Sequence, residues 1–242
     1  MFSKLQSLLR QYWGYDDFRG IQREIIESIC SGHDTLGLMP TGGGKSITFQ
    51  VPALALEGTC VVITPLIALM KDQVQNLCSR GIRAAAIYSG LHREAIITIL
   101  ENAVFGHVRI LYVSPERLSS ELFRTKLRHV KVSFICVDEA HCISQWGYDF
   151  RPSYLHIADI RRDLPGVPVL ALTATATAAV IADIQDKLAV TPGGRPSFNV
   201  FRMSFERTNL AYIVRHASDK RDELLHILDN VPGSAIVYLR SR

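Results

Sequence analysis

One stretch of the sequence, Leu-Met-Pro-Thr-Gly-Gly-Gly-Lys-Ser at 38–46, constrains this chain more than any other. It joins a short apolar run to a helical segment, and its successive glycines allow backbone N–H groups to turn toward one centre without Cβ clashes. A lysine placed here reaches the β- and γ-phosphates of a nucleotide, a serine hydroxyl suits Mg²⁺, and the helix N-terminus favours an anion. The predicted phosphate-binding residues are Thr41, Gly42, Gly43, Gly44, Lys45 and Ser46, and Ser46 is also a predicted Mg²⁺ ligand.

Short apolar runs alternate with longer amphipathic segments from residue 35 onward, which predicts an α/β fold. We expect buried parallel strands at 35–38, 60–64, 84–88, 110–113, 134–137 and 169–173. Helices are expected at 46–55, 67–80, 93–105, 115–118, 153–162 and 178–188, after a small N-terminal helical segment. In such a doubly wound, mainly parallel sheet with helices on both faces, ligands collect at the carboxyl ends of the strands.

The segment Phe-Ile-Cys-Val-Asp-Glu-Ala-His at 134–141 ends an apolar strand with two adjacent carboxylates and a histidine. Two acids at a buried edge require a metal ion or a reacting water. Asp138 suits Mg²⁺ ligation through water, and Glu139 suits activation of the attacking water. His141 is placed to report the state of the γ-phosphate to its neighbours. With Lys45, these three are the predicted catalytic residues.

An aromatic turn precedes the glycine-rich loop in the sequence, with Tyr15, Arg19 and Gln22 close together. A carboxamide can form paired hydrogen bonds with an adenine edge while an aromatic ring stacks on the base. Aromatic residues on such a turn also pack in protein cores, and the residues alone do not decide between the two uses.

The loop at 142–152, which contains glycine and ends in proline, carries three aromatic residues and an arginine. Stacking of unpaired bases on such rings contributes about 1–3 kcal/mol per base, and packing as a core plug is the competing interpretation. Paired hydroxyls after the strand at 169–173 can link the carboxylates to a moving neighbour. The residues assigned to nucleic-acid contact or coupling are Trp146, Tyr148, Phe150, Arg151, Thr173 and Thr175.

Two further hydroxyl residues, Thr64 and Ser114, each follow a strand and open a helix. They can hold phosphates of a nucleic-acid backbone. They can equally act as plain helix caps, the more common use of such residues.

Composition narrows the class of protein. The 242 residues are 48% hydrophobic, ample for a buried core, and 27 basic residues against 23 acidic ones give a charge of only +4. Any nucleic-acid surface is therefore expected to be a local track. Five cysteines without a C-x-x-C pair argue against zinc and disulfides. The absence of a long apolar run predicts no membrane segment and a reducing cytoplasm.

A turn-rich break at 191–196 separates the main body of the chain from its last part. A strand is expected at 199–204, a charged helix at 219–228 and a strand at 235–239. We therefore expect one domain at 1–208, followed by a linker and the start of a second at 209–242. A lone helix with one strand cannot bury a core of its own.

With these motifs the chain resembles the N-terminal part of a RecQ-family helicase of superfamily 2, from about Leu5 onward. The resemblance rests on Met-Pro-Thr-Gly-Gly-Gly-Lys-Ser, Asp-Glu-Ala-His-Cys-Ile-Ser-Gln-Trp-Gly-Tyr-Asp-Phe-Arg-Pro and Leu-Thr-Ala-Thr-Ala. Met39 stands where the strict phosphate-loop pattern has glycine, as in the helicase variant. Glu206 and Thr208 stand where relatives commonly have aspartate and proline, which affects only the expected linker geometry.

The resemblance implies a RecA-like P-loop lobe that binds ATP and Mg²⁺ in an enzyme that unwinds DNA with 3′–5′ polarity. It implies adenine recognition by Tyr15, Arg19 and Gln22, and coupling of single-stranded DNA to hydrolysis by the loop at 144–151. The implied partners are single-stranded and forked DNA and a second RecA-like lobe, in a bacterial cytoplasm at the nucleoid.

Most of that second lobe, with the arginines it supplies to the γ-phosphate, is missing from these residues. We therefore expect this chain to bind ATP and to hydrolyse it slowly or not at all. Two alternatives remain open. The chain can be a lobe of an RNA helicase, since the Asp-Glu-Ala-His box also occurs there, or a non-catalytic module that binds nucleotide and DNA.

Overall fold

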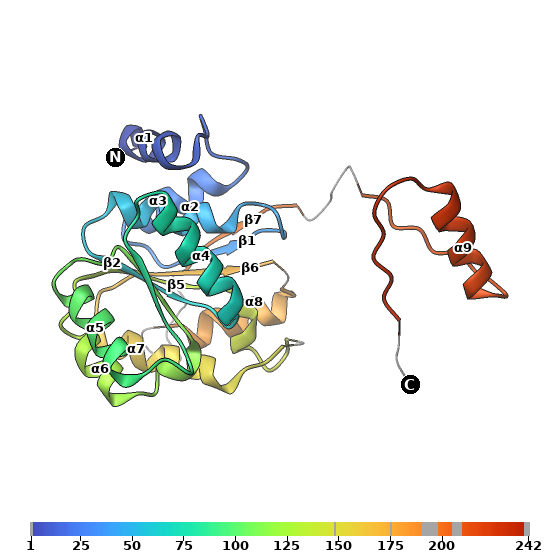
Figure 1. Cartoon of the computed structure of the whole chain (residues 1–242). Helices are drawn as coiled ribbons and strands as arrows, with labels where there is room; N and C mark the ends of the chain where they lie inside the picture. The colour runs from blue at the N-terminus through green and yellow to red at the C-terminus, as the bar shows by residue number, and fades with distance from the viewer. Residues whose placement is uncertain (1, 148, 175, 190–197, 205–209, 240–242) are drawn as a thin grey trace. The chain divides into compact units, whose positions relative to one another are not determined.

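The computed structural model describes residues 2–147, 149–174, 176–189, 198–204 and 210–239 (Figure 1). The chain divides into two compact units, Met1–Phe205 and Glu206–Arg242. Among the described residues, the first unit contains the whole sheet and the second contains a single helix. The domain boundary expected after residue 208 falls at 205–209, outside the described residues.

Seven parallel strands form the sheet of the first unit, in the order β3-β4-β2-β5-β6-β1-β7. The strands are β1 (Thr35–Leu38), β2 (Thr59–Ile63), β3 (Ala84–Ile87), β4 (Ile110–Val113), β5 (Val132–Val137), β6 (Val169–Thr173) and β7 (Asn199–Arg202). Only β6 lies between β1 and β5. Because all strands run the same way, the segments that follow β1, β5 and β6 emerge at one edge of the sheet.

Helices cover both faces of this sheet. One face packs against α2 (Gln22–Cys30), α3 (Lys45–Ala55) and α4 (Ile67–Ser79). The other face packs against α5 (Arg93–Val104), α6 (Glu121–Leu127), α7 (Ile157–Asp163) and α8 (Ala178–Lys187). The first helix, α1 (Phe2–Trp13), lies beyond α2 and α3 on the side away from the sheet (Figure 1).

The strands are apolar on both faces because both are covered. In β2, Cys60 and Val62 pack in the core that includes α3, whereas Val61 and Ile63 pack in the opposite core. This two-sided burial explains why the strands appear in the sequence as continuous apolar runs. The predicted strands at 35–38, 110–113 and 169–173 coincide with β1, β4 and β6, and the other four agree within two residues at each end.

Short helices were harder to predict. The segment predicted at 115–118 is the 3₁₀ helix η1 (Pro115–Arg117), and that at 153–162 divides into the 3₁₀ helix η3 (Pro152–His156) and α7. Helix α6 was not predicted, because its seven residues bury only Phe123 and Leu127 and so leave little helical periodicity. In the described part of the chain, every helix is too short or too polar to cross a membrane.

The second unit contains α9 (Lys220–Asn230), where a helix was predicted; its N-terminus is capped by the Asp219 carboxylate, which accepts from the N–H groups of Arg221 and Asp222. The prediction of a strand at 235–239 is wrong. These residues have no strand assignment, and Ile236 is 80% exposed. An apolar run becomes a strand only when a neighbouring strand takes up its hydrogen bonds, and the described residues of this unit contain none.

Candidate nucleotide site

The glycine-rich loop connects β1 to α3, as the sequence predicts. Gly42 and Gly44 have φ angles of 81° and 78°, in the left-handed region that favours glycine. A Cβ on Gly44 would lie 2.3 Å from the Gln22 Nε2 atom, so a side chain here would displace Gln22 as well as strain the backbone. Met39 is fully buried in the core between the sheet and α3, which explains how the loop accommodates it in place of a glycine.

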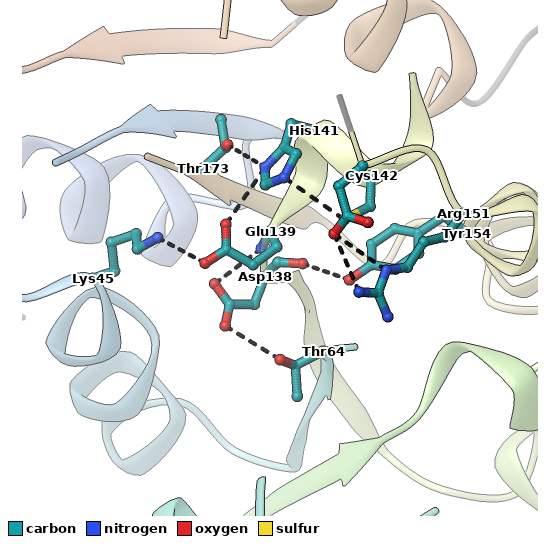
Figure 2. Close-up of polar contacts among 10 residues, drawn as sticks. Lys45, Thr64, Asp138, Glu139, His141, Cys142, Arg151, Tyr154 and Thr173 are labelled. Atoms are coloured by element: carbon teal, nitrogen blue, oxygen red, sulfur yellow. Dashed lines mark hydrogen bonds and ion pairs between the residues drawn. The ribbon is translucent and has the colours of Figure 1, made fainter. Parts of the chain in front are cut away.

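Lys45 and Glu139 meet across the edge of the sheet, although 94 residues separate them in the sequence. The Lys45 Nζ lies 3.2 Å from the Glu139 Oε1, with the two side chains 16% and 27% exposed (Figure 2). Lys45 is the first residue of α3, and Glu139 follows β5, so the strand order itself creates the contact. Ser46 occupies the same first turn of α3.

Asp138 is the most buried acid of the site. Its Oδ2 accepts a hydrogen bond from the Thr64 hydroxyl at 3.4 Å, and its Oδ1 accepts one from the Glu139 N–H at 3.0 Å. Burial raises the pKa of Asp138 above its usual range, and the charge of Glu139 acts in the same direction, while Lys45 opposes both. A divalent cation beside this carboxylate would stabilise its ionised form.

Glu139 has an unusual backbone. Its φ of 48° is the only positive value among the described non-glycine residues. A conformation of this kind costs on the order of 1–3 kcal/mol and persists where the surrounding structure holds it. The strain therefore falls on the residue predicted to activate water, and a sequence pattern could not reveal it.

His141 connects the carboxylates to β6. Its Nδ1 lies 2.9 Å from the Thr173 Oγ1 and 3.4 Å from the Glu139 Oε2 (Figure 2). Burial lowers the pKa of His141, so the imidazole is mainly neutral at neutral pH. The structure thus brings together Lys45, Asp138, Glu139, His141 and Thr173. The other predicted coupling hydroxyl, Thr175, lies outside the described residues.

A cavity of about 380 Å³ adjoins the phosphate loop and is lined by Tyr15, Arg19 and Gln22, together with Ser46 and the loop glycines. The Arg19 guanidinium lies 5.1 Å from the centre of the Tyr15 ring, whose residue is 45% exposed. Gln22 is buried; its Oε1 accepts from the Arg19 N–H at 2.8 Å, and its Nε2 donates to the Gly43 and Gly44 carbonyls at 3.2 Å. Gln22 therefore also supports the loop, a role the sequence analysis did not predict.

The aromatic loop after β5 exposes its tryptophan. The Trp146 residue is 78% exposed, which rules out a core plug at this position. The Phe150 ring centre lies 5.9 Å from the Lys187 Nζ, and Phe150 is partly buried. Tyr148 lies outside the described residues. Among the described residues of the loop, Trp146 therefore presents an exposed aromatic ring.

Arg151 anchors one end of this loop by a salt bridge to Asp149, with N–O distances of 3.1 and 3.3 Å. The same Asp149 oxygen accepts from the Cys142 thiol at 3.6 Å, and burial raises the pKa of that thiol to about 12. His141, Cys142 and Asp149 place ligand atoms within 4.8 Å of one another. The Arg151 guanidinium contacts the Asp149 carboxylate, so Asp149 forms a salt bridge here instead of serving as a cation ligand.

Two contacts near the carboxylates were not predicted from the sequence. The Tyr154 hydroxyl donates to the Asp138 carbonyl at 2.9 Å, and Thr64 bonds the Asp138 carboxylate instead of capping α4, which begins at Ile67. Ser114 Oγ is buried and lacks a hydrogen-bond partner among the described residues, so it does not cap η1 either. The Tyr154–Asp138 and Thr64–Asp138 hydrogen bonds join residues 16 and 74 positions apart, so no local sequence pattern predicts them.

Comparison with known proteins gives a consistent result. The DEAD/DEAH box helicase family matches residues 19–184. The chain is 42% identical over 244 aligned residues to the "Probable ATP-dependent DNA helicase RecS" of Bacillus subtilis, covering 99% of this chain and 48% of that protein. It is 43% identical to the "ATP-dependent DNA helicase RecQ" of the same organism, covering 100% of this chain and 41% of the relative. The chain therefore spans about half the length of these relatives, or less.

Solved structures share the fold. A hypothetical ATP-dependent RNA helicase from Sulfolobus tokodaii matches with a TM-score of 0.61 at 19% identity, over 84% of this chain and 57% of that one. The helicase Lhr of Mycobacterium smegmatis, solved with single-stranded DNA and AMP-PNP, matches with a TM-score of 0.61 at 18% identity, over 82% of this chain and 28% of that one. Both confirm the α/β architecture with a P-loop.

Proposed function

This chain belongs to the DEAD/DEAH box helicases, and we propose that it is the ATP-binding motor lobe of a 3′–5′ DNA helicase of the RecQ type. One observation carries the proposal: the phosphate-loop Lys45 lies 3.2 Å from the Glu139 carboxylate that follows β5. A loop that binds phosphate and a carboxylate that can activate water therefore face one space. We also propose the domain division at 1–208 and 209–242.

The residues fit Mg·ATP. The loop backbone is shaped for glycine, since a Cβ on Gly43 would lie 2.9 Å from the Pro40 carbonyl oxygen. Lys45 and Ser46 begin α3 directly after the loop, and Asp138 follows β5 across the edge. Ser46 and Asp138 would hold Mg²⁺, Asp138 through water. Bound Mg·ATP supplies the phosphoanhydride bond that is hydrolysed. With a γ-phosphate bound, Lys45 would turn from Glu139 toward it, and the Glu139 carboxylate, released from its ion pair, could then orient and deprotonate a water.

Base selection belongs to the cavity beside the loop. Tyr15 and Arg19 form one wall, and Gln22 connects that wall to the phosphate loop through the Gly43 and Gly44 carbonyls. We propose that adenine lies against these residues. The fit of the base would then affect the position of the loop that holds the phosphates, through the hydrogen bonds of Gln22.

DNA is the proposed polymer. The curated relatives are named as DNA helicases, and the exposed Trp146, in the loop that follows the two carboxylates in the sequence, can supply a stacking surface. Single-stranded and forked DNA, and a second RecA-like lobe that closes on the nucleotide, are the proposed partners. A bacterial cytoplasm, at the nucleoid, is the proposed location.

The test measures ATP hydrolysis by the full-length protein that contains this chain, with single-stranded DNA or RNA of one sequence. We expect DNA to stimulate turnover more than RNA, and a Glu139→Gln variant to lose turnover while it keeps ATP binding. Stronger stimulation by RNA would favour an RNA helicase. Equal turnover in the wild type and the Glu139→Gln variant would contradict the assigned role of Glu139, and no turnover in either would favour a non-catalytic binding module.

A further inference from the structure

The Tyr154 hydroxyl donates a hydrogen bond to the Asp138 carbonyl at 2.9 Å (Figure 2). Tyr154 is fully buried and belongs to η3, which starts where the aromatic loop ends. We propose that Tyr154 is a positioning residue that holds the Asp138–Glu139 peptide in its strained orientation and transmits movement of the aromatic loop to the Glu139 carboxylate. The inference rests on the proposed function, because it concerns the carboxylate that activates water.

The peptide between Asp138 and Glu139 is held at both of its polar groups. Tyr154 bonds the carbonyl, and the Asp138 carboxylate accepts from the N–H at 3.0 Å. A peptide unit is planar, so rotating it changes the φ of Glu139 together with the ψ of Asp138. The φ of 48° at Glu139 is unfavourable for a residue with a side chain, so the conformation depends on contacts that hold this plane.

The direction of the Glu139 side chain follows from that backbone. Its two oxygens contact Lys45 at 3.2 Å and His141 at 3.4 Å. Relaxing Glu139 to a negative φ would turn its Cα–Cβ bond away from this position. The Tyr154 hydroxyl therefore acts on the carboxylate through the backbone, without touching it.

The aromatic loop leads directly to this hydroxyl. Its far end is pinned where the Arg151 N–H donates to the Cys142 carbonyl at 2.8 Å, and the Tyr154 N–H donates to the Arg151 carbonyl at 2.9 Å. Only two residues separate Arg151 from Tyr154. A displacement of Arg151 when DNA binds the loop would therefore act on the Tyr154 hydroxyl through this short segment.

The test is Tyr154→Phe, which removes the hydroxyl and keeps the buried ring. Tyr112→Phe is the matched control, because Tyr112 is also buried in this lobe but its hydroxyl accepts from the Gln50 side chain at 3.3 Å. In the full-length protein with single-stranded DNA, we expect Tyr154→Phe to lower kcat for ATP roughly 10- to 100-fold, the range for a small displacement of a catalytic group. The KM for ATP should change by no more than about twofold, since ground-state binding is untouched.

The outcomes separate the two proposals. A wild-type protein without DNA-stimulated turnover would overturn the proposed function. With normal wild-type turnover, an unchanged kcat in Tyr154→Phe would overturn the role of Tyr154 alone. An equal fall in Tyr112→Phe, or a melting temperature lowered in step with kcat, would show a structural effect and overturn it as well. A fall in kcat confined to Tyr154→Phe, with melting and ATP affinity retained, supports it.

Discussion

At the scale of single residues, Gln22 is the side chain that we propose to serve both the base and the phosphates. Its carboxamide bonds the Arg19 N–H and the Gly43 and Gly44 carbonyls, so it joins the wall of the cavity to the loop. Gln22→Ala should weaken the binding of both ATP and GTP by loosening the loop. It should weaken ATP more, because the selective contacts to adenine depend on this wall.

The measurement is a pair of affinities, for ATP and GTP, in the wild type and in Gln22→Ala. We expect the wild type to prefer ATP and the variant to lose most of that preference. A preference that survives the substitution unchanged would assign base selection to other residues, and equal wild-type affinities would assign this turn to packing.

Trp146 tests the aromatic loop at the same scale. Because this residue is 78% exposed, Trp146→Ala should change the free energy of unfolding by no more than about 0.5 kcal/mol. Loss of a stacked base costs roughly 1–3 kcal/mol, so affinity for single-stranded DNA should fall about 5- to 150-fold. Fluorescence anisotropy and thermal melting give the two quantities. A large loss of stability with unchanged DNA affinity would contradict the stacking role.

At the scale of elements, α6 and α7 are joined by a charged contact. Asp163, the last residue of α7, pairs with Arg124 of α6 and with Arg128 just after it, the latter at 2.6 Å. Asp163 has a side chain only 9% exposed, whereas the two arginines are 32% and 54% exposed. The hydrogen bond from Arg124, together with that from Arg128, lowers the pKa of Asp163 below its usual 3.8.

Asp163→Asn should therefore destabilise the protein by about 1 kcal/mol at neutral pH, a value kept small because the arginines are partly exposed. A carboxyl whose pKa is lowered by folding contributes stability above its unfolded pKa. That contribution is lost as the pH falls through 3.8 toward the lower folded value. Chemical denaturation at several pH values should show the difference from wild type shrinking over this acid range. Asp16→Asn is the control, because Asp16 pairs with Arg10 and its side chain is 91% exposed, so its replacement should have almost no effect. A pH-independent difference for Asp163→Asn would contradict the ion pair.

Elements also show what the sequence could and could not predict. Strands β1, β4 and β6 were predicted to the residue because each is buried along its whole length and consists mainly of apolar residues. The run at 235–239 looks the same in sequence but lacks a partner strand among the described residues. The glycine-rich loop and the two carboxylates carry their chemistry in adjacent residues. The role of Tyr154 and the φ of Glu139 could not be predicted, because both depend on contacts between separate segments of the chain.

At the scale of the whole molecule, the parallel sheet is what makes one site from distant motifs. β6 separates β1 from β5, and all three end at one edge, so Lys45, Thr173 and Glu139 converge there. The helices on both faces bury the strands and leave this edge for ligands. We therefore propose, above all, that this edge binds Mg·ATP through the phosphate loop.

Titration of the 242-residue chain with ATP and Mg²⁺ tests that claim most directly. Lys45→Ala is compared with Lys126→Ala, whose lysine pairs with Glu101 on the surface at 3.4 Å, away from the loop. Loss of a charged hydrogen-bond donor to phosphate costs roughly 1.5–3 kcal/mol, so Lys45→Ala should weaken binding about 10-fold or more. Lys126→Ala should bind like the wild type. Equal affinity in wild type and Lys45→Ala, or no binding by the wild type, would contradict the account.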